Sequence, residues 1–238
     1  MTVNPAPEPK GLVVVSAGTG NPSSTRRLID RIAQKSLDVL THGGTPATAT
    51  VIELGPLAVD TARAAVAGFP GEQLQAAIDR LAAADAIIAA TPVYKAGLSG
   101  LFKSFFDVLD DDLLVAKPVL LAATGGTPRH ALVIDDQMRP LFAYLRALTV
   151  PTSVYAAPED WGSTELGTRI ERAAIELAVL VRAGVEHEIA DDAWSSYQHQ
   201  FAGNATRAER TAADVDFDSP LMRLAAGGSH VPPQRNAA

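Results

Sequence analysis

The feature that most constrains the fold is a strand–loop–helix unit between Asp85 and Leu109. The run Asp85–Ala90 is apolar and short, which is typical of a strand buried on both faces. A polar stretch, Thr91–Ser99, follows it. Beyond this stretch apolar residues recur at steps of three and four, which predicts one face of a helix. These positions are Leu98, Leu101, Phe102, Phe105, Phe106 and Leu109. In an open α/β sheet, loops at the carboxyl ends of the strands are where ligands bind.

The same unit recurs along the chain. Four further apolar runs predict strands at Leu12–Val15, Thr48–Leu54, Val119–Ala123 and Val150–Tyr155. Helical periodicity predicts helices at about residues 24–40, 72–83, 99–109, 134–148 and 164–188. Residues 56–71 have no clear period and are expected to be irregular. Alternating strands and helices predict an α/β fold with a five-stranded parallel sheet and helices on both faces.

Composition excludes several classes of function. The chain has 238 residues with a net charge of −7, which argues against a general nucleic-acid binder. It has no cysteine, so disulfides, thiolate catalysis and thiolate metal sites are excluded, and we expect no metal site. The first ten residues lack an apolar signal core, and no apolar run approaches the ~20 residues that span a bilayer. We therefore expect a cytoplasmic protein without a membrane partner.

The ends of the chain differ from its middle. Residues 1–10 are rich in proline and are expected to be a flexible leader, and residues 11–189 are expected to form the domain. Residues 190–238 are polar with scattered aromatic anchors such as Trp194 and Phe201. They are either a disordered tail or an arm that packs on a neighbouring subunit.

Three predicted strands end in similar turns. A hydroxyl residue followed by small or turn-forming residues comes after each of them: Ser16-Ala-Gly, Thr91-Pro-Val-Tyr and Thr124-Gly-Gly-Thr. The carboxyl ends of parallel strands lie on one edge of a sheet, so these turns are expected to meet. Glycine lets backbone N–H groups come close to a ligand. The sequence therefore predicts a single binding site built from three turns.

The first turn has the residues of a phosphate site. Ser23, Ser24 and Thr25 lie at a predicted helix amino terminus, where unpaired amides and the helix dipole favour an anion. The turn lacks both the dinucleotide glycine fingerprint and the Walker sequence, so a monophosphate held by hydroxyls and amides is the better interpretation. The alternative is that these hydroxyls only cap the helix.

Three segments together resemble the NAD(P)H-dependent FMN reductases of flavodoxin-like fold. They are LVVVSAGTGNPSSTRRL, ATPVYKAGLSGLFKSFFD and ATGGTPRHALVID, within about residues 11–185. Similar members supply reduced flavin to sulfonate-type or luciferase-like monooxygenases. The resemblance implies a flavodoxin-like three-layer sandwich, a homodimer or homotetramer, FMN as cofactor and NADPH or NADH as reductant. It also implies a flavin-dependent monooxygenase as the partner that receives reduced FMN.

Carried over by position, the resemblance assigns a group of residues to each part of FMN. Ser16, Ser23, Ser24 and Thr25 would hold the phosphate; Pro92, Val93, Tyr94 and Lys95 would flank the ribityl chain and isoalloxazine; Thr124, Gly125, Gly126 and Thr127 would contact the ring edge. One departure is in the first turn, where sulfonate-linked members carry a basic residue in a shorter loop and this chain has Gly18–Pro22.

The chemistry needs little from side chains, because hydride passes from nicotinamide to flavin and the cofactor carries the reaction. We therefore predict no catalytic side chain. His130 and Arg129 are candidates for nucleotide contacts, although a polar loop explains both. Two other functions stay open: a reductase of quinones or azo dyes with tightly held FMN, and a flavodoxin-like electron carrier. An aromatic content of 5% favours an open flavin site from which FMN can exchange.

Overall fold

The computed structural model describes residues 8–193, with the backbone alone for residues 191–193. The strands are Lys10–Ser16 (β1), Ala47–Glu53 (β2), Ala86–Tyr94 (β3), Gly97–Leu98 (β4), Pro118–Thr124 (β5), Leu148–Thr149 (β6) and Val154–Ala156 (β7). The α-helices are Ser24–His42 (α1), Leu54–Ala67 (α2), Glu72–Ala82 (α3), Gly100–Asp107 (α4), Arg139–Tyr144 (α5), Thr164–Ala183 (α6) and Val185–Ala193 (α7). Short helical turns are Pro128–His130 (η1, 3₁₀), Ile134–Met138 (η2, π-helical) and Pro158–Gly162 (η3, 3₁₀).

The expected leader up to Pro7 and the expected arm from Trp194 onward lie outside the described residues, whereas Lys10 already belongs to β1. Within the described part of the chain, no helix combines the length and the apolar character that crossing a bilayer requires.

The parallel strands follow the order β2-β1-β3-β5, with β6 and β7 beside β5. Counted along the chain, with β6 and β7 as one interrupted strand, this order is 2-1-3-4-5. That is the flavodoxin-like doubly wound order. The predicted α/β class, the parallel sheet and the flavodoxin-like fold are confirmed. Within residues 8–193 the sheet has seven strands rather than five, because β4 adds an antiparallel hairpin to β3 and the fifth strand is divided.

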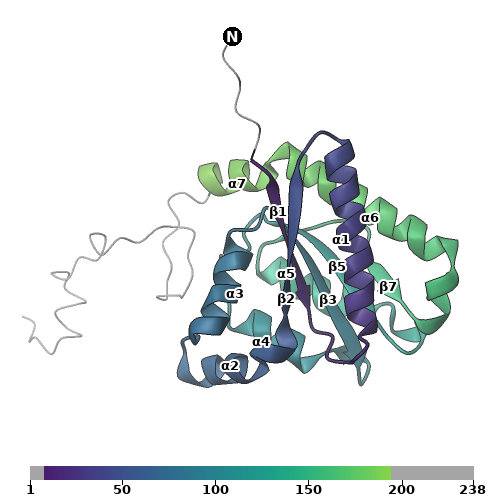
Figure 1. Ribbon diagram of the computed structural model, residues 1–238. Coiled ribbons are helices and arrows are strands. Elements are labelled where there is room, and N and C mark those ends of the chain that lie inside the picture. Colours follow the sequence, from purple (N-terminus) through teal and green to yellow (C-terminus); the bar gives the residue numbers. More distant parts are fainter. Residues whose placement is uncertain (1–7, 194–238) are drawn as a thin grey trace, which may run out of the picture. The chain divides into compact units, whose positions relative to one another are not determined.

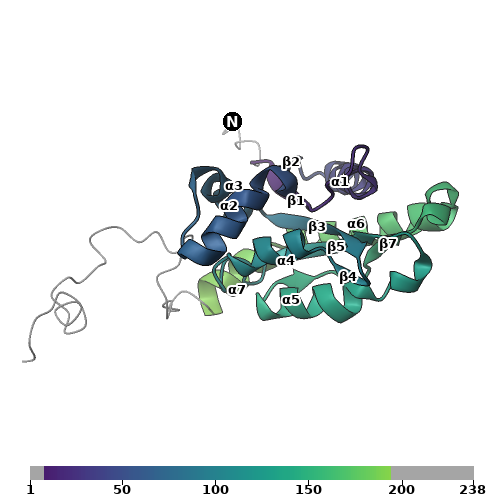
Figure 2. The ribbon, with the colours of Figure 1, turned by 90° about the horizontal axis from the view of Figure 1, so that it is seen from below.

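Both faces of the sheet are covered, which explains why the strands are almost continuously apolar. Along β1, Val13 and Val15 face one core, whereas Leu12 and Val14 face the other. The first core includes side chains from α2, α3, α4 and α5, and the second includes side chains from α1 and α6. Figures 1 and 2 show the sheet between these two helical layers.

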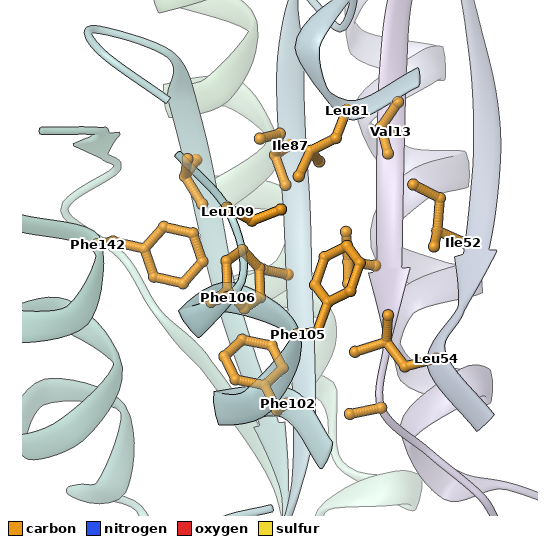
Figure 3. Close-up of a cluster of buried hydrophobic side chains, with 14 of the residues drawn as sticks. Val13, Ile52, Leu54, Leu81, Ile87, Phe102, Phe105, Phe106, Leu109 and Phe142 are labelled. Carbon is orange, nitrogen blue, oxygen red and sulfur yellow. The ribbon is translucent and has the colours of Figure 1, made fainter. Parts of the chain in front are cut away.

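The apolar stripe that the sequence places after Thr91 forms the aromatic centre of the first core (Figure 3). Phe102, Phe105 and Phe106 of α4 are fully buried, and Phe142 of α5 joins them. The ring of Phe106 lies 4.7 Å from that of Phe102 and 4.8 Å from that of Phe142, measured between centroids. This cluster fixes α4 against the sheet and so fixes the turn that precedes α4.

The fifth strand differs from its prediction as one run, Val150–Tyr155. It consists of β6, which pairs with the start of β5, and β7, which pairs with its end. Pro151 lies between them, and a proline has no N–H to give to the ladder. The segment expected to be irregular contains α2, whose first turn accommodates Pro56 because amides there lack helical partners.

Two predicted helices are shorter than expected. The helix predicted for residues 134–148 is the π-helical turn η2 followed by α5, which ends at Tyr144. A regular α-helix would press the Pro140 ring against the carbonyl of Asp136, and the wider π turn lies directly before this proline. The last helix, predicted for residues 164–188, is interrupted at Gly184, which has a left-handed φ of 65° and separates α6 from α7.

Candidate functional site

The three turns meet in one pocket of about 280 Å³ at the carboxyl ends of β1, β3 and β5. Predicted site residues that line it are Ser23, Ser24, Thr25, Pro92, Val93, Tyr94, Thr124, Gly125 and Gly126. Gly18, Thr19, Gly20, Pro22 and Pro158 complete the lining. Ser16, Lys95 and Thr127 are the predicted residues that do not line it. The structure therefore brings together turns that are up to a hundred residues apart in the chain.

The first turn leads directly into α1. Ser23 is the N-cap, and its Oγ accepts the N–H of Arg26 at 3.1 Å. A side chain at Gly18 is excluded, because a Cβ there would lie 2.2 Å from the Ser23 Oγ. The first turn of this 19-residue helix contains no carboxylate. The amino terminus of α1 can therefore attract an anion without competition from acidic side chains of its own first turn.

Two hydroxyl residues hold the first and third turns together. Thr25 and Thr124 are both buried, and their Oγ1 atoms lie 2.7 Å apart in a hydrogen bond. Ser16 is fully buried beneath the first turn, where its Oγ accepts the N–H of Gly18 at 3.4 Å. Thr25 thus connects two walls of the pocket, and Ser16 supports one of them from below.

The residues predicted as the second turn, Thr91–Tyr94, belong to the end of β3. A tight hairpin follows them and joins β3 to β4. Its two loop residues, Lys95 and Ala96, have left-handed φ angles of 51° and 63°. This conformation costs a residue with a side chain about 1–2 kcal/mol. Tyr94 lines the pocket with 54% of its surface exposed, whereas Lys95 is exposed and does not line it. Sequence reasoning missed the hairpin because Lys-Ala is not a typical loop pair for it.

The third turn is packed against Tyr155 of β7. The Tyr155 hydroxyl donates to the carbonyl of Thr127 at 2.6 Å, and a Cβ at Gly125 would lie 2.2 Å from that hydroxyl. The Gly125 N–H donates to the carbonyl of Ala156 at 3.2 Å, so it is engaged within the protein. Burial, followed by the charges of Asp160 and Glu159, raises the pKa of Tyr155 and keeps it a hydrogen-bond donor.

Other candidate residues lie outside the pocket lining. The Thr127 Oγ1 accepts the N–H of Arg129 at 3.0 Å and thereby caps η1, and neither Arg129 nor His130 lines the pocket. The described residues that line the pocket are hydroxyl residues, glycines, prolines, Val93 and Tyr94 rather than charged residues.

The arginine that follows Ser23, Ser24 and Thr25 is paired with two carboxylates. Arg26 pairs with Asp30 at 2.8 Å and with Glu53 at the end of β2. The hydrogen bonds that Arg26 donates to these two carboxylates, that to Asp30 first, raise the pKa of Arg26. Arg27 lies over the indole of Trp161, with 4.9 Å between the guanidinium carbon and the ring centroid. An anion at the amino terminus of α1 would thus be met mainly by neutral donors.

The NADPH-dependent FMN reductase family matches residues 11–162 of the chain. An FMN reductase (NADPH) from Pseudomonas aeruginosa is 39% identical over 170 residues, which cover 71% of this chain and 89% of the relative. The NADH-dependent FMN reductase SfnF from Pseudomonas fluorescens is 37% identical over 170 residues, with 71% and 88% covered.

An oxidoreductase of known structure from Corynebacterium diphtheriae is similar in both sequence and fold. It is 42% identical with a TM-score of 0.72, covering 74% of this chain and 98% of that one. The residues that the family matches include all three turns that line the pocket. The chain belongs to the family of NADPH-dependent FMN reductases.

Proposed function

We propose that this protein is an NAD(P)H:FMN oxidoreductase that transfers hydride from a nicotinamide to FMN. The observation that carries the proposal is the single pocket formed by three turns, one of which is the carboxylate-free amino terminus of a long helix. The membership of the chain in the FMN reductase family supports FMN as the ligand of this pocket. The relatives named above use NADPH or NADH, so both are candidate reductants.

The residues of the pocket fit a flavin mononucleotide. Hydroxyls of Ser23, Ser24 and Thr25 and the amides of the first turn of α1 would hold the phosphate. Pro92, Val93 and Tyr94 would flank the ribityl chain and the ring. Because the Gly125 amide is engaged by Ala156, we assign the hydrogen bond to the ring edge to the amide of Gly126. Ser16, Lys95 and Thr127 would support these turns from positions outside the lining.

When bound, FMN supplies the hydride-accepting chemistry, and the protein binds and orients it. The amide of Gly126 is a fixed dipole, so it can stabilise negative charge on the ring without reorganising. The pocket volume of about 280 Å³ is slightly below the ~300–1,000 Å³ range for small-molecule sites. A flavin there would keep part of its ring exposed, as contact with a nicotinamide requires.

Exposure also supports exchange of the flavin. Tyr94, the aromatic side chain of the pocket, is 54% exposed. Weak stacking lets FMN leave after reduction, so we propose that a flavin-dependent monooxygenase receives it. We further propose that the protein acts in the cytoplasm as a homodimer or homotetramer. Residues 11–189 would be its FMN-binding domain, preceded by a leader and followed by an arm or tail at 190–238.

A steady-state assay tests this function. Oxidation of NADPH and NADH is followed at 340 nm with FMN, FAD or riboflavin added to the purified protein. We expect turnover that depends on added FMN, and a protein that purifies pale. A protein that purifies yellow and reduces quinones without added FMN would indicate a tightly held prosthetic group. A bound flavin that dithionite reduces but that neither NADPH nor NADH reduces would indicate an electron carrier.

A further inference from the structure

The hairpin that carries Tyr94 has a loop that needs support. Lys95 and Ala96 both have positive φ angles, the shape for which a two-residue hairpin loop favours asparagine and glycine. Neither residue type is present at these two positions. Contacts from outside the loop must therefore hold it in this shape.

The base of the hairpin is held from the interior. The Thr91 Oγ1 accepts the N–H of Ser99 at 3.0 Å, and the hydroxyls of these two buried residues lie 3.2 Å apart. This contact closes the stem where β4 leads into α4. It lies below the loop, so it does not itself hold Lys95 and Ala96.

Gln137 contacts the hairpin next to the loop. Its Oε1 accepts the N–H of Leu98 at 3.0 Å, and its Nε2 donates a longer bond to the carbonyl of Ala96 at 3.5 Å. The carboxamide thus bridges the last loop residue and the returning strand. A Cβ at Gly97 would lie 3.1 Å from the Gln137 Oε1, so the absence of a side chain at Gly97 permits this approach.

The π-helical turn determines where this carboxamide lies. In η2 the N–H of Arg139 donates to the carbonyl of Ile134, five residues earlier. Ile134 and Met138 are buried, which leaves Gln137 on the exposed side. The Arg139 side chain donates to the carbonyls of Val150 at 3.0 Å and Pro151 at 2.6 Å, so the end of the turn is tied to the β6–β7 segment.

We infer that Gln137 is a positioning residue for the flavin. From the π-helical turn its carboxamide holds the left-handed loop Lys95–Ala96, and the loop in turn sets the place of Tyr94 on the pocket. Because η2 follows the third turn in the chain, the contact also couples the second wall of the pocket to the third. The inference rests on the proposed function, since it assumes that the pocket binds FMN.

The test replaces Gln137 and the loop residue that it supports. Gln137→Met keeps the length of the side chain without either hydrogen bond. We expect the Kd for FMN, measured by quenching of flavin fluorescence, and the KM for FMN to rise about three- to tenfold. We expect kcat at saturating FMN to change little, and the visible spectrum of bound flavin to shift. Gln137→Glu keeps the acceptor for the Leu98 N–H. Its Kd for FMN should therefore lie between that of the unmodified protein and that of Gln137→Met.

Rescue distinguishes positioning from a general loss of stability. Glycine adopts a positive φ without steric cost. The double variant Gln137→Met/Ala96→Gly should therefore recover most of the affinity for FMN that Gln137→Met loses. Asp136→Asn, on the same exposed side of η2, is the matched control and should bind FMN as the unmodified protein does. Thermal unfolding confirms that each variant is folded.

Two results would overturn the inference while leaving the proposed function intact. One is an unchanged Kd and flavin spectrum in folded Gln137→Met. The other is a loss of FMN affinity in Gln137→Met that is equally large in Asp136→Asn, or that the added Ala96→Gly substitution does not recover. Failure of the unmodified protein to bind FMN would instead overturn the proposed function, and the inference with it.

Discussion

At the residue scale, Ser24 is the most direct test of the phosphate site. It is an exposed residue in the first turn of α1, beside amides that have no helical partner. Ser24→Asp would set a carboxylate against the phosphate of FMN. We predict that it weakens FMN binding at least about tenfold, as a loss near 1.4 kcal/mol implies. Fluorescence titration measures the effect.

The controls for this prediction separate charge from shape. Ser24→Asn has almost the shape of aspartate without the charge and should retain most of the affinity. Riboflavin lacks the phosphate, so its binding should change much less than that of FMN. Equal affinity of Ser24→Asp and the unmodified protein for FMN would mean that the phosphate lies elsewhere.

Glu53 limits the positive charge available to the phosphate. It pairs with Arg26, which follows the phosphate turn and also pairs with Asp30. Glu53→Gln would weaken this pairing and remove a negative charge near the amino terminus of α1. We predict that FMN binds about two- to fivefold more tightly, in line with charge effects at helix termini.

Riboflavin and a second charge removal are the controls for Glu53→Gln. The affinity for riboflavin should stay the same, because the effect acts through the phosphate. Asp79→Asn removes an equal charge from the surface of α3, where the carboxylate accepts from Gln75. A gain of affinity in Asp79→Asn as large as that in Glu53→Gln would show that net charge, rather than Arg26, is responsible.

At the scale of elements, α4 connects the flavin turn to the core. Phe106 lies within 4.7 to 5.3 Å of Phe102, Phe105 and Phe142, measured between ring centroids. Phe106→Ala would leave a cavity at the centre of this cluster. We predict that it lowers the free energy of unfolding by about 3–5 kcal/mol in chemical denaturation.

An exposed phenylalanine provides the comparison. Phe69 follows α2 and is 67% exposed, so Phe69→Ala should change the free energy of unfolding by less than about 0.5 kcal/mol. Comparable losses from both substitutions would indicate that Phe106 is not central to the core.

At the scale of the whole molecule, a buried ion pair joins α7 to the sheet. Lys117 directly precedes β5, and its Nζ donates to Glu186 of α7 at 2.8 Å and to the carbonyl of Ala82 at 3.0 Å. Side-chain exposure is 1% for Lys117 and 8% for Glu186. Removing one partner of a buried pair leaves an uncompensated charge.

We therefore predict that Lys117→Met lowers the free energy of unfolding by about 3–5 kcal/mol. The double variant Lys117→Met/Glu186→Leu should recover much of this loss, since neither charge is then left buried. Lys35→Met removes an exposed pair with Glu171 and should cost about 0–1 kcal/mol. A double variant that is less stable than Lys117→Met would contradict the argument.

Much of the fold could be predicted from local sequence patterns. The continuous apolar runs of β1, β3 and β5 and the helical spacing of Phe102, Phe105 and Phe106 reflect burial that repeats along one element. Turns rich in hydroxyl and glycine residues after three strands predicted a common site, because parallel strands end on the same edge. These signals are repeats along one element or neighbouring residues in the chain. They can therefore be recognised without knowledge of tertiary contacts.

Only the tertiary structure shows how distant residues meet. Thr25 and Thr124, Gln137 and Leu98, and Arg26 and Glu53 are pairs separated by 27 to 99 positions. Nothing next to Gln137 in the sequence indicates a hairpin contact, and only packing reveals that Glu53 engages Arg26. The sequence by itself determined most of the strands and helices and the segments that meet at the pocket. Tertiary packing determined which side chains in those turns are available to a ligand, because a hydrogen bond depends on distance in space rather than along the chain.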